Sequence, residues 1–261
     1  MADFLTSTWD SLFKERNKGG EIMSDIKDFL DTIIQGDCLE VLKTFPDKSV
    51  DLILTDPPYT ITANKRYKGS GFYKKTDHLA NIDESFGTDF NPREFLEIAY
   101  TKSKNGMLIW CSQKQLLDYI NFANEKNFKW DLMFWHKINA CPNHFNHLLI
   151  DTEYCVRIYE SGSYFNNNLE YKEYRKYFLE TVQHFEGHPT PKPLNIMFKQ
   201  IRLFSKENDI ILDPFLGSGT TAVACKMLGR HYIGIELNSK YVEIANKRLN
   251  FEMLDFGGKD K

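Results

Sequence analysis

The residues Asp56-Pro57-Pro58-Tyr59 place a carboxylate, two prolines and an aromatic ring directly after the apolar run Val50 to Leu54. A short apolar run of this kind predicts a buried strand. Two consecutive prolines fix both of their φ angles and push Asp56 out of the helical region, so the segment is predicted to be stiff and extended. A stiff turn at the end of a strand lies where open α/β sheets bind their ligands.

Such a turn could hold a planar group that carries an amine. A nucleobase amino nitrogen is a poor nucleophile, because its lone pair is delocalised into the ring. The Asp56 side chain and the Pro57 carbonyl could each accept a hydrogen bond from one of the two N–H groups of this amine. The carboxylate would also stabilise the positive charge that develops as the nitrogen attacks an electrophile. Tyr59 would stack on the base, a contact worth about 1–3 kcal/mol. An ordinary strand-ending turn accounts for the same residues equally well.

A glycine-rich stretch in the second half of the chain favours the chemical interpretation. It runs Asp213-Pro214-Phe215-Leu216-Gly217-Ser218-Gly219-Thr220-Thr221-Ala222, between a strand predicted over 209–212 and a helix predicted over 220–228. Glycines let backbone amides approach a ligand that a Cβ would obstruct. Glu236, near the end of a strand predicted over 232–237, follows Gly217 by nineteen positions. At that spacing an acidic residue meets ribose hydroxyls.

Asp213 narrows the identity of the ligand. Gly217-x-Gly219-x-x-Ala222 alone would also be compatible with a nicotinamide dinucleotide. A carboxylate just ahead of the glycine turn would repel a pyrophosphate, but it suits an ammonium group. A ligand with an amine at one end and a ribose at the other fits S-adenosylmethionine (SAM), whose electrophilic methyl group is what an activated amino nitrogen needs.

Three motifs together resemble the DNA amino-methyltransferases. They are Asp56 to Tyr59, Asp213 to Thr221 and His188-Pro189-Thr190-Pro191-Lys192-Pro193. The order, with the Asp-Pro-Pro-Tyr motif ahead of the glycine motif, resembles the beta group, typified by the MboII and RsrI adenine methyltransferases. The resemblance covers roughly 33–249, and Pro191 stands where the family usually has Gln.

The resemblance implies an α/β fold with a doubly wound, mostly parallel sheet of the SAM-dependent methyltransferase (Rossmann-like) type, circularly permuted. Carried over by position, Asp56, Pro57, Pro58 and Tyr59 hold a flipped-out base. Asp37 and Cys38 lie beside the adenine of the cofactor, and Glu236 takes its ribose. The methionine end is lined by Asp213, Phe215, Gly217, Gly219 and Thr220, with Ser218 and Thr221 of the same motif also predicted to bind SAM.

The predicted activity is methyl transfer from SAM to the exocyclic amino group of adenine, adenine-N(6), in double-stranded DNA by direct in-line attack. The target nucleotide must leave the base stack, and this unstacking costs roughly a few kcal/mol of free energy. An acidic first residue in the motif is more typical of adenine enzymes. Two alternatives are also compatible with the sequence: a cytosine-N(4) or RNA amino-methyltransferase, and a catalytically silent DNA- or cofactor-binding regulator. Methylation of the cytosine ring carbon needs a cysteine after a proline, whereas Cys141 precedes Pro142.

Length and composition predict one core carrying insertions, because 261 residues with 42% hydrophobic content can bury a sizeable core. We expect an N-terminal appendage at 1–30 and a catalytic domain at 31–261. Within the domain we expect an inserted substrate loop at 60–88 and a target-recognition segment at 161–187.

Five scattered cysteines, no signal-peptide pattern and no apolar span predict a cytoplasmic protein without membrane association.

Partners and metals are less constrained by the sequence. The resemblance is compatible with a homodimer and with a separately acting cognate restriction endonuclease. Cys141, His144 and His147 share one loop, but a single thiol without paired spacing predicts no metal site. A net charge of −3 gives no global attraction for nucleic acid, so DNA binding requires a local basic patch.

The predicted patch is the stretch 60–88, where aromatic residues alternate with Lys65, Arg66, Lys68, Lys74 and Lys75. We interpret it as a loop that grips phosphates beside the Asp56 turn; the alternative is an ordinary solvated loop. Replacing the five basic residues with Ala is expected to weaken DNA binding and flatten its salt dependence, because fewer counterions are released. Titrations of a labelled duplex at several salt concentrations measure this, and equal loss of SAM binding would indicate misfolding instead.

Overall fold

The computed structural model describes residues 25–58, 90–140, 148–183 and 191–256, with only the backbone described over 251–256. Several predicted features therefore lie outside the described residues: Tyr59, the basic loop 60–88, the Cys141 to His147 cluster and His188 to Thr190. Among the described residues, no helix is long and apolar enough to cross a membrane.

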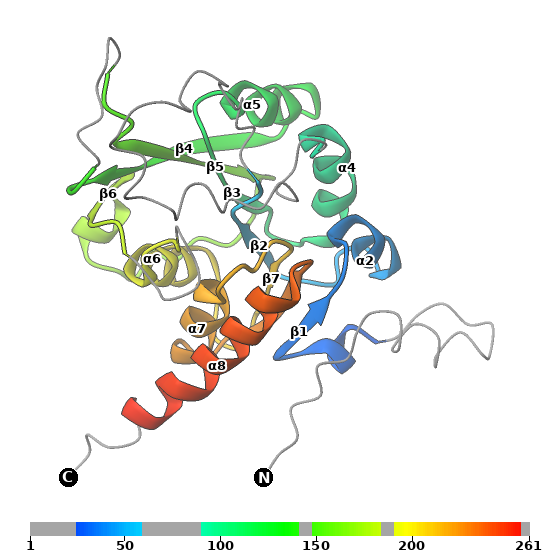
Figure 1. The fold of residues 1–261 in the computed structure, drawn as a ribbon. Coiled ribbons are helices and arrows are strands. Elements are labelled where there is room, and N and C mark those ends of the chain that lie inside the picture. The colour runs from blue at the N-terminus through cyan, green and yellow to red at the C-terminus, as the bar shows by residue number, and fades with distance from the viewer. Residues whose placement is uncertain (1–24, 59–89, 141–147, 184–190, 257–261) are drawn as a thin grey trace, which may run out of the picture.

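An eight-stranded sheet forms the middle layer of the molecule (Figure 1). The strand order is β1-β8-β7-β2-β3-β5-β4-β6. The first five strands in this order run parallel, β5 runs antiparallel to both of its neighbours, and β6 is parallel to β4. The bounds are Thr32–Gln35 (β1), Leu52–Thr55 (β2), Met107–Cys111 (β3), Lys129–Lys137 (β4), Thr152–Tyr159 (β5), Tyr177–Glu180 (β6), Ile210–Asp213 (β7) and His231–Glu236 (β8).

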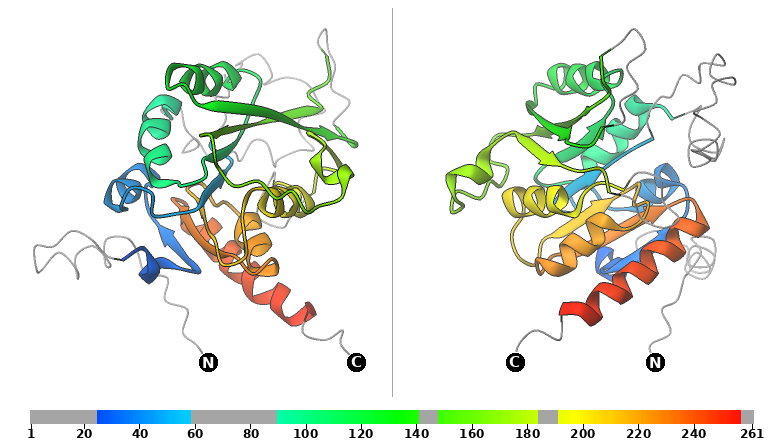
Figure 2. Two further views of the ribbon diagram at one scale, coloured as in Figure 1. Left: turned by 180° about the vertical axis from the view of Figure 1, so that it is seen from behind. Right: turned by 60° about the vertical axis from the view of Figure 1, so that its left-hand side comes forward.

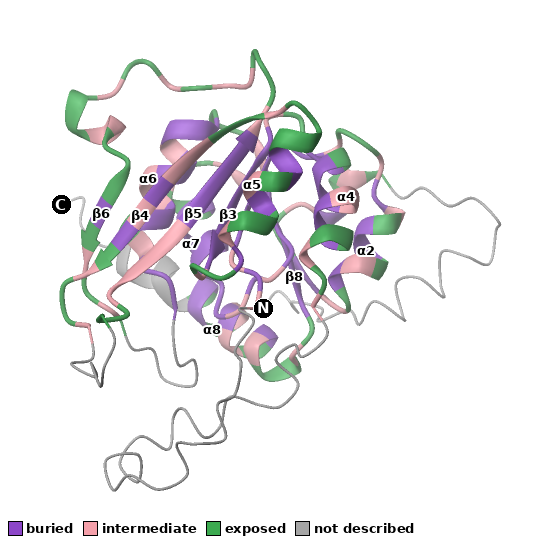
Figure 3. Ribbon diagram, turned by 90° about the horizontal axis from the view of Figure 1, so that it is seen from above, coloured by how far each residue is buried: buried purple, intermediate pink, exposed green. Residues whose placement is uncertain are grey.

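Helices cover both faces of the sheet (Figure 2). One apolar core joins the sheet to α2, α4 and α5, and a second core joins the opposite face to α6, α7 and α8. Figure 3 shows the central strands buried between these layers, whereas the edge strand β6 is largely exposed. The helix bounds are Cys38–Thr44 (α2), Pro92–Lys102 (α4), Leu116–Glu125 (α5), Leu194–Phe204 (α6), Thr220–Met227 (α7) and Ser239–Phe256 (α8), with short 3-10 turns at Ile26–Phe29 (η2) and Tyr171–Tyr174 (η5).

The α4 helix illustrates how local sequence sets an element. Asn91 is its N-cap, and the Asn91 side chain accepts a hydrogen bond from the Arg93 N–H at 3.0 Å. Pro92 occupies the first helical position, where its missing N–H has no intrahelical partner to lose. The apolar stripe of the helix is buried against the sheet and consists of Phe95, Leu96, Ala99 and Tyr100.

The connections create a switch point between β2 and β7. The chain crosses from β2 to β3 through α4 on one face and from β7 to β8 through α7 on the other. In doubly wound sheets, ligands bind outside the carboxyl ends of the strands at such a point. The predicted doubly wound, mostly parallel α/β fold is confirmed, and the two chemical motifs follow the two strands that flank the switch.

The residues of β6 carry no periodic apolar pattern. Residues 177–180 lie in the predicted target-recognition segment 161–187, and they pair in parallel with β4 and bury Phe178. Only that residue of the four is buried, so the strand has too short an apolar pattern to be recognised.

Gly106 allows β3 to begin close beside the end of β5. Its φ is +92°, and a Cβ there would lie 2.1 Å from the Ile158 carbonyl oxygen. We expect Gly106→Ala to lower the free energy of unfolding by at least about 2 kcal/mol, because the backbone strain and the overlap add. Gly162 is the matched control: its φ is +90°, but a Cβ would meet nothing within 4 Å. Equal losses in urea unfolding of the two alanine variants would contradict the role of the overlap.

Candidate active site

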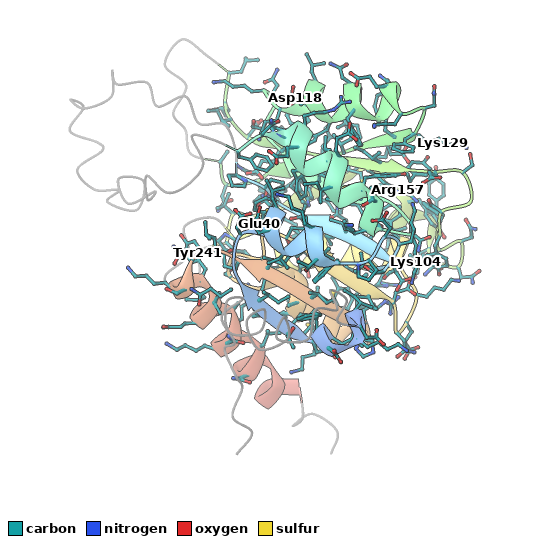
Figure 4. All side chains as sticks on the ribbon, turned by 90° about the vertical axis from the view of Figure 1, so that its right-hand side faces the viewer. Glu40, Lys104, Asp118, Lys129, Arg157 and Tyr241 are labelled. Atoms are coloured by element: carbon teal, nitrogen blue, oxygen red, sulfur yellow. The ribbon has the colours of Figure 1, made fainter. Side chains whose placement is uncertain are left out.

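The candidate site lies along one edge of the sheet. In Figure 4, Glu40, Asp118 and Tyr241, which belong to the first turns of α2, α5 and α8, lie toward one side, and Lys104, Lys129 and Arg157 lie toward the other. The side with the helix starts is the edge at which the parallel strands end. Four predicted acidic residues follow consecutive strands along it: Asp37 after β1, Glu236 at the end of β8, Asp213 at the end of β7 and Asp56 after β2.

Asp213 joins the two motifs. Its carboxylate accepts hydrogen bonds from the Thr55 hydroxyl at 2.7 Å, the Thr221 hydroxyl at 2.6 Å and the Phe215 N–H at 3.1 Å. Burial raises the pKa of Asp213 to about 6, although these hydrogen bonds oppose the increase. Asp213 therefore ties β2, the glycine turn and α7 together, and its predicted contact with an ammonium group would be made by an already anchored carboxylate.

Two glycines shape the turn between β7 and α7. Gly217 and Gly219 have φ values of +56° and +83°. A Cβ on Gly219 would lie 2.9 Å from the Ala245 Cβ of α8, so the glycine is needed for the close packing of α7 on α8. The Gly217 N–H donates to Glu236 Oε2 at 2.8 Å, and the Asn238 N–H donates to Oε1 at 2.8 Å. Glu236 thus closes the turn from the neighbouring strand, and burial raises its pKa.

Two further residues predicted to bind the cofactor, Asp37 and Cys38, lie at the start of α2. The Asp37 carboxylate caps α2 by accepting from the Leu39 and Glu40 N–H groups at 2.9 and 3.1 Å. The Cys38 thiol is buried, which raises its pKa to about 12. The Gly36 N–H donates to the Glu236 carbonyl at 3.1 Å, which places the start of α2 next to Glu236.

The glycine motif also packs toward both helix layers. The Phe215 ring lies 5.4 Å from Phe90 and 5.3 Å from Phe95, between ring centroids. Ser218, Thr220 and Thr221 are buried at the start of α7. Arg248 of α8 donates to the Thr220 hydroxyl at 2.7 Å.

The Asp56 turn is held from β3. Gln115, which lies just ahead of α5, donates from Nε2 to the Pro58 carbonyl at 3.0 Å. Its other amide atom accepts from the Ser112 N–H and hydroxyl at 3.3 and 3.0 Å. Pro57 is buried, and Gln115 is 2% exposed. The prolines and this fixed amide together keep the turn in one extended conformation.

Sequence reasoning missed the charged partners of Asp56. The Lys192 ammonium contacts Asp56 Oδ2 and, at 2.9 Å, Glu153 Oε2. Lys137 contacts the other Glu153 oxygen at 2.6 Å. Burial lowers the pKa of Lys192, but the two carboxylates outweigh burial and hold the pKa above its usual range. Two sequence features could have indicated these partners: Lys192 stands between two prolines, and Glu153 stands near the start of an apolar strand.

The residues along this edge fit SAM. The start of α7 has no side-chain cap, so its first backbone amides can receive the carboxylate of the methionine end. Each oxygen of a carboxylate can accept more than one hydrogen bond, so Glu236 can take ribose hydroxyls while it holds the glycine turn. Asp37 and Cys38 stand beside Glu236, where the adenine was predicted to lie.

A family model described as DNA methylase, of the N6/N4 methyltransferase type, matches residues 50–247, and the chain belongs to this family. The match spans the Asp56 turn, the Lys192 segment and the glycine motif.

Individual relatives agree with the family. The chain is 33% identical over 255 residues to the type II methyltransferase M.HinfI of Haemophilus influenzae, with 86% of this chain and 70% of that protein covered. It is 32% identical over 250 residues to M2.MboI of Moraxella bovis, covering 86% and 89%. The crystal structure of M1.HpyAVI with SAM superposes with a TM-score of 0.63 at 28% identity, covering 84% and 98%. The cytosine-N4-specific PvuII methyltransferase, at 18% identity and a TM-score of 0.61, shares the fold.

The buried Asp213 predicts a specific pH dependence of stability. Its pKa rises from 3.8 to about 6 on folding, so the folded protein binds more protons and loses stability as pH rises across this interval. Between pH 4 and 7 the wild type should lose about 2 kcal/mol more unfolding free energy than Asp213→Asn, since one pKa unit corresponds to about 1.4 kcal/mol and part of the titration lies below pH 4. Urea unfolding at each pH measures the difference.

Asp47→Asn is the matched control. Asp47 is exposed, and its hydrogen bond with Lys102 lowers its pKa, which gives stability a slope of opposite sign. This variant should therefore keep the downward slope of the wild type. Parallel curves for the wild type and Asp213→Asn would contradict the burial of an ionisable carboxyl.

Proposed function

We propose that this protein transfers a methyl group from SAM to the exocyclic amino group of adenine in double-stranded DNA. The observation that carries the proposal is the hydrogen bond between Thr55 and Asp213 at 2.7 Å. It joins the strand that ends in the amine-holding turn to the strand that ends in the cofactor turn. This proximity supports the proposal that an amino group held at Asp56 meets the methionine end of the cofactor.

Bound SAM supplies an electrophilic methyl group, and the chain supplies orientation and charge. The Asp56 carboxylate and the Pro57 carbonyl each accept a hydrogen bond from one N–H group of the amino group. These two hydrogen bonds orient the nitrogen lone pair toward the methyl group. As positive charge develops on the nitrogen, the Asp56 carboxylate stabilises it in a partly buried setting, where electrostatic interactions are stronger than in water. Tyr59 stacks on the base, which leaves the duplex to reach the turn.

Adenine is the proposed target because the first residue of the Asp56 motif is acidic. The basic residues from Lys65 to Lys75 are proposed to contact the DNA backbone, and the segment 161–187 to read the sequence. A homodimer, a cytoplasmic location and a separately acting endonuclease stay predictions drawn from the sequence.

The test compares methyl transfer to unmethylated genomic DNA by the wild type and Asp56→Ala. Asp56→Ala should reduce the rate by about 100-fold or more, because it removes both an acceptor and the stabilising charge. The affinity for SAM should stay unchanged, since the Asp213 and Glu236 contacts are intact. Labelled methyl incorporation and a SAM titration give the two readouts.

Asp47→Ala serves as the control, since Asp47 is an exposed acid paired with Lys102. It should methylate at the wild-type rate. Equal incorporation by the wild type and Asp56→Ala would refute the mechanism. Sequencing of the product at single-molecule resolution identifies the base: modified adenines in one short motif support the proposal, and modified cytosines would overturn its choice of base.

A further inference from the structure

Four charged groups form a continuous row that ends at the Asp56 turn. Lys137 of β4 contacts Glu153 of β5 at 2.6 Å, Glu153 contacts Lys192 at 2.9 Å, and Lys192 contacts Asp56. Their signs alternate, and the row runs from the β4–β5 pair to the carboxyl end of β2. Lys137 and Glu153 belong to none of the three motifs that the sequence analysis recognised.

Burial decreases the freedom of the groups in the middle of the row. The side chain of Lys192 is 5% exposed and that of Glu153 is 13% exposed, whereas Asp56 is 29% exposed and faces the site. A buried ammonium requires compensating carboxylates, since burial without partners would neutralise it. Glu153 and Asp56 together raise the pKa of Lys192, so the lysine stays charged.

The backbone around the row is rigid at Glu153 and at Lys192. Glu153 pairs with Trp135 in the β4–β5 ladder, so its Cα position is set by the sheet. Lys192 is flanked by Pro191 and Pro193, and Pro193 is the N-cap of α6. The flexible part is the four-carbon stem of the lysine, and two anchors fix the ammonium at its end. Glu153 is the more buried of the two anchors.

We infer that Glu153 is a positioning residue for methyl transfer: it holds the Lys192 ammonium against Asp56, and Lys192 keeps that carboxylate ionised and oriented toward the amino group. The inference rests on the proposed function and extends it to a residue outside the motifs. A carboxylate has about four lone-pair sites, so Asp56 can accept both from Lys192 and from a base.

Within the part of the chain that the structure describes, the other ionisable groups named here beside Asp56 are neutral or acidic. Burial raises the pKa of the Cys111 thiol of β3 to about 12. This thiol also interacts electrostatically with Asp56, Lys192, Glu153 and Asp118. Cys155 of β5 is likewise neutral, because burial raises its pKa. Asp213 adds a further carboxylate: burial raises its pKa, and the nearby charge of Asp56 raises it further. Tyr119 of α5 is kept neutral by burial. Among the described residues in contact with Asp56, Lys192 is therefore the cation that can hold it ionised.

The decisive experiment is a double-mutant cycle of Glu153→Gln and Lys192→Met on the full chain. Glu153→Gln should lower kcat by about 10- to 100-fold, because a loosely held ammonium misplaces the Asp56 carboxylate. In the Lys192→Met background the same change should have little further effect, since Glu153 acts through the lysine. Losses that multiply in the double variant would overturn the inference.

The pH profile separates positioning from a purely structural ion pair. Lys192→Met should move the acidic limb of kcat to higher pH, because Asp56 loses its cation and keeps Glu153 and Asp213 as negative neighbours. Lys192→Arg retains the charge and should leave the limb near that of the wild type. An acidic limb that stays in place in Lys192→Met would contradict the role given to the lysine.

A surface pair provides matched controls. Lys126 and Glu97 contact each other at 2.8 Å between α5 and α4, with side chains 39% and 41% exposed. Lys126→Met and Glu97→Gln should retain the wild-type kcat and pH profile. Thermal unfolding and a SAM titration confirm that every variant is folded, and Glu153→Gln, which conserves shape, gives the test if Lys192→Met does not fold.

A carboxyl titration distinguishes failure of this inference from failure of the proposed function. Carbon-13 NMR of the Asp56 carboxyl, assigned with Asp56→Asn, reports its protonation in the cofactor-free protein without any turnover. A midpoint that rises in Lys192→Met supports the inference even if the wild type does not methylate DNA, and an unchanged midpoint overturns it. A wild type that is inactive on every DNA tested refutes the proposed function alone.

Discussion

The pairing of β2 with β7 is the constraint on which the site depends. These strands are far apart in the chain, yet Leu52 and Ile53 lie in register with Ile211 and Leu212. That register brings Thr55 against Asp213, and the hydrogen bond between them fixes the distance between two turns of different function. Because α4 and α7 leave on opposite faces, these two strand ends flank a switch point, the place where doubly wound sheets bind their ligands. The rest of the sheet serves to hold this register.

The acidic residues along the edge are each held by donors from a neighbouring element. Asp213 accepts from Thr55 of β2, Glu236 accepts from Gly217 of the next turn, and Asp56 is met by Lys192. Carboxylates fixed in this way need little reorganisation when charge develops beside them, which is the condition for effective electrostatic stabilisation. Burial raises the pKa of both Asp213 and Glu236, so the donors also offset part of the desolvation. Stability at this edge is thus coupled to pH through the same groups that we propose to orient ligands.

Local sequence patterns predicted the elements that carry the proposed site. The strands predicted over 209–212 and 232–237 and the helix predicted over 220–228 agree within a residue with β7, β8 and α7. Glu236 lies beside Gly217 of the glycine motif. The Lys192–Glu153 contact could not be predicted, because it joins residues on separate elements and depends on β5 running antiparallel beside β3. Gln115 was missed for the same reason: its partner is a backbone carbonyl, which leaves no trace in side-chain type.

The antiparallel strand β5 explains why a motif-based description of the site is incomplete. Reversal of β5 brings its first residues, and not its last, to the edge at which β2 and β3 end. Glu153 therefore reaches Lys192 from the start of its strand, a place where the rule for parallel sheets would not look for functional residues. The same reversal makes Lys137, at the end of β4, the outer member of the charged row. Part of the environment of Asp56 is thus set by the three strands added beyond β3, whose residues carry none of the three motifs.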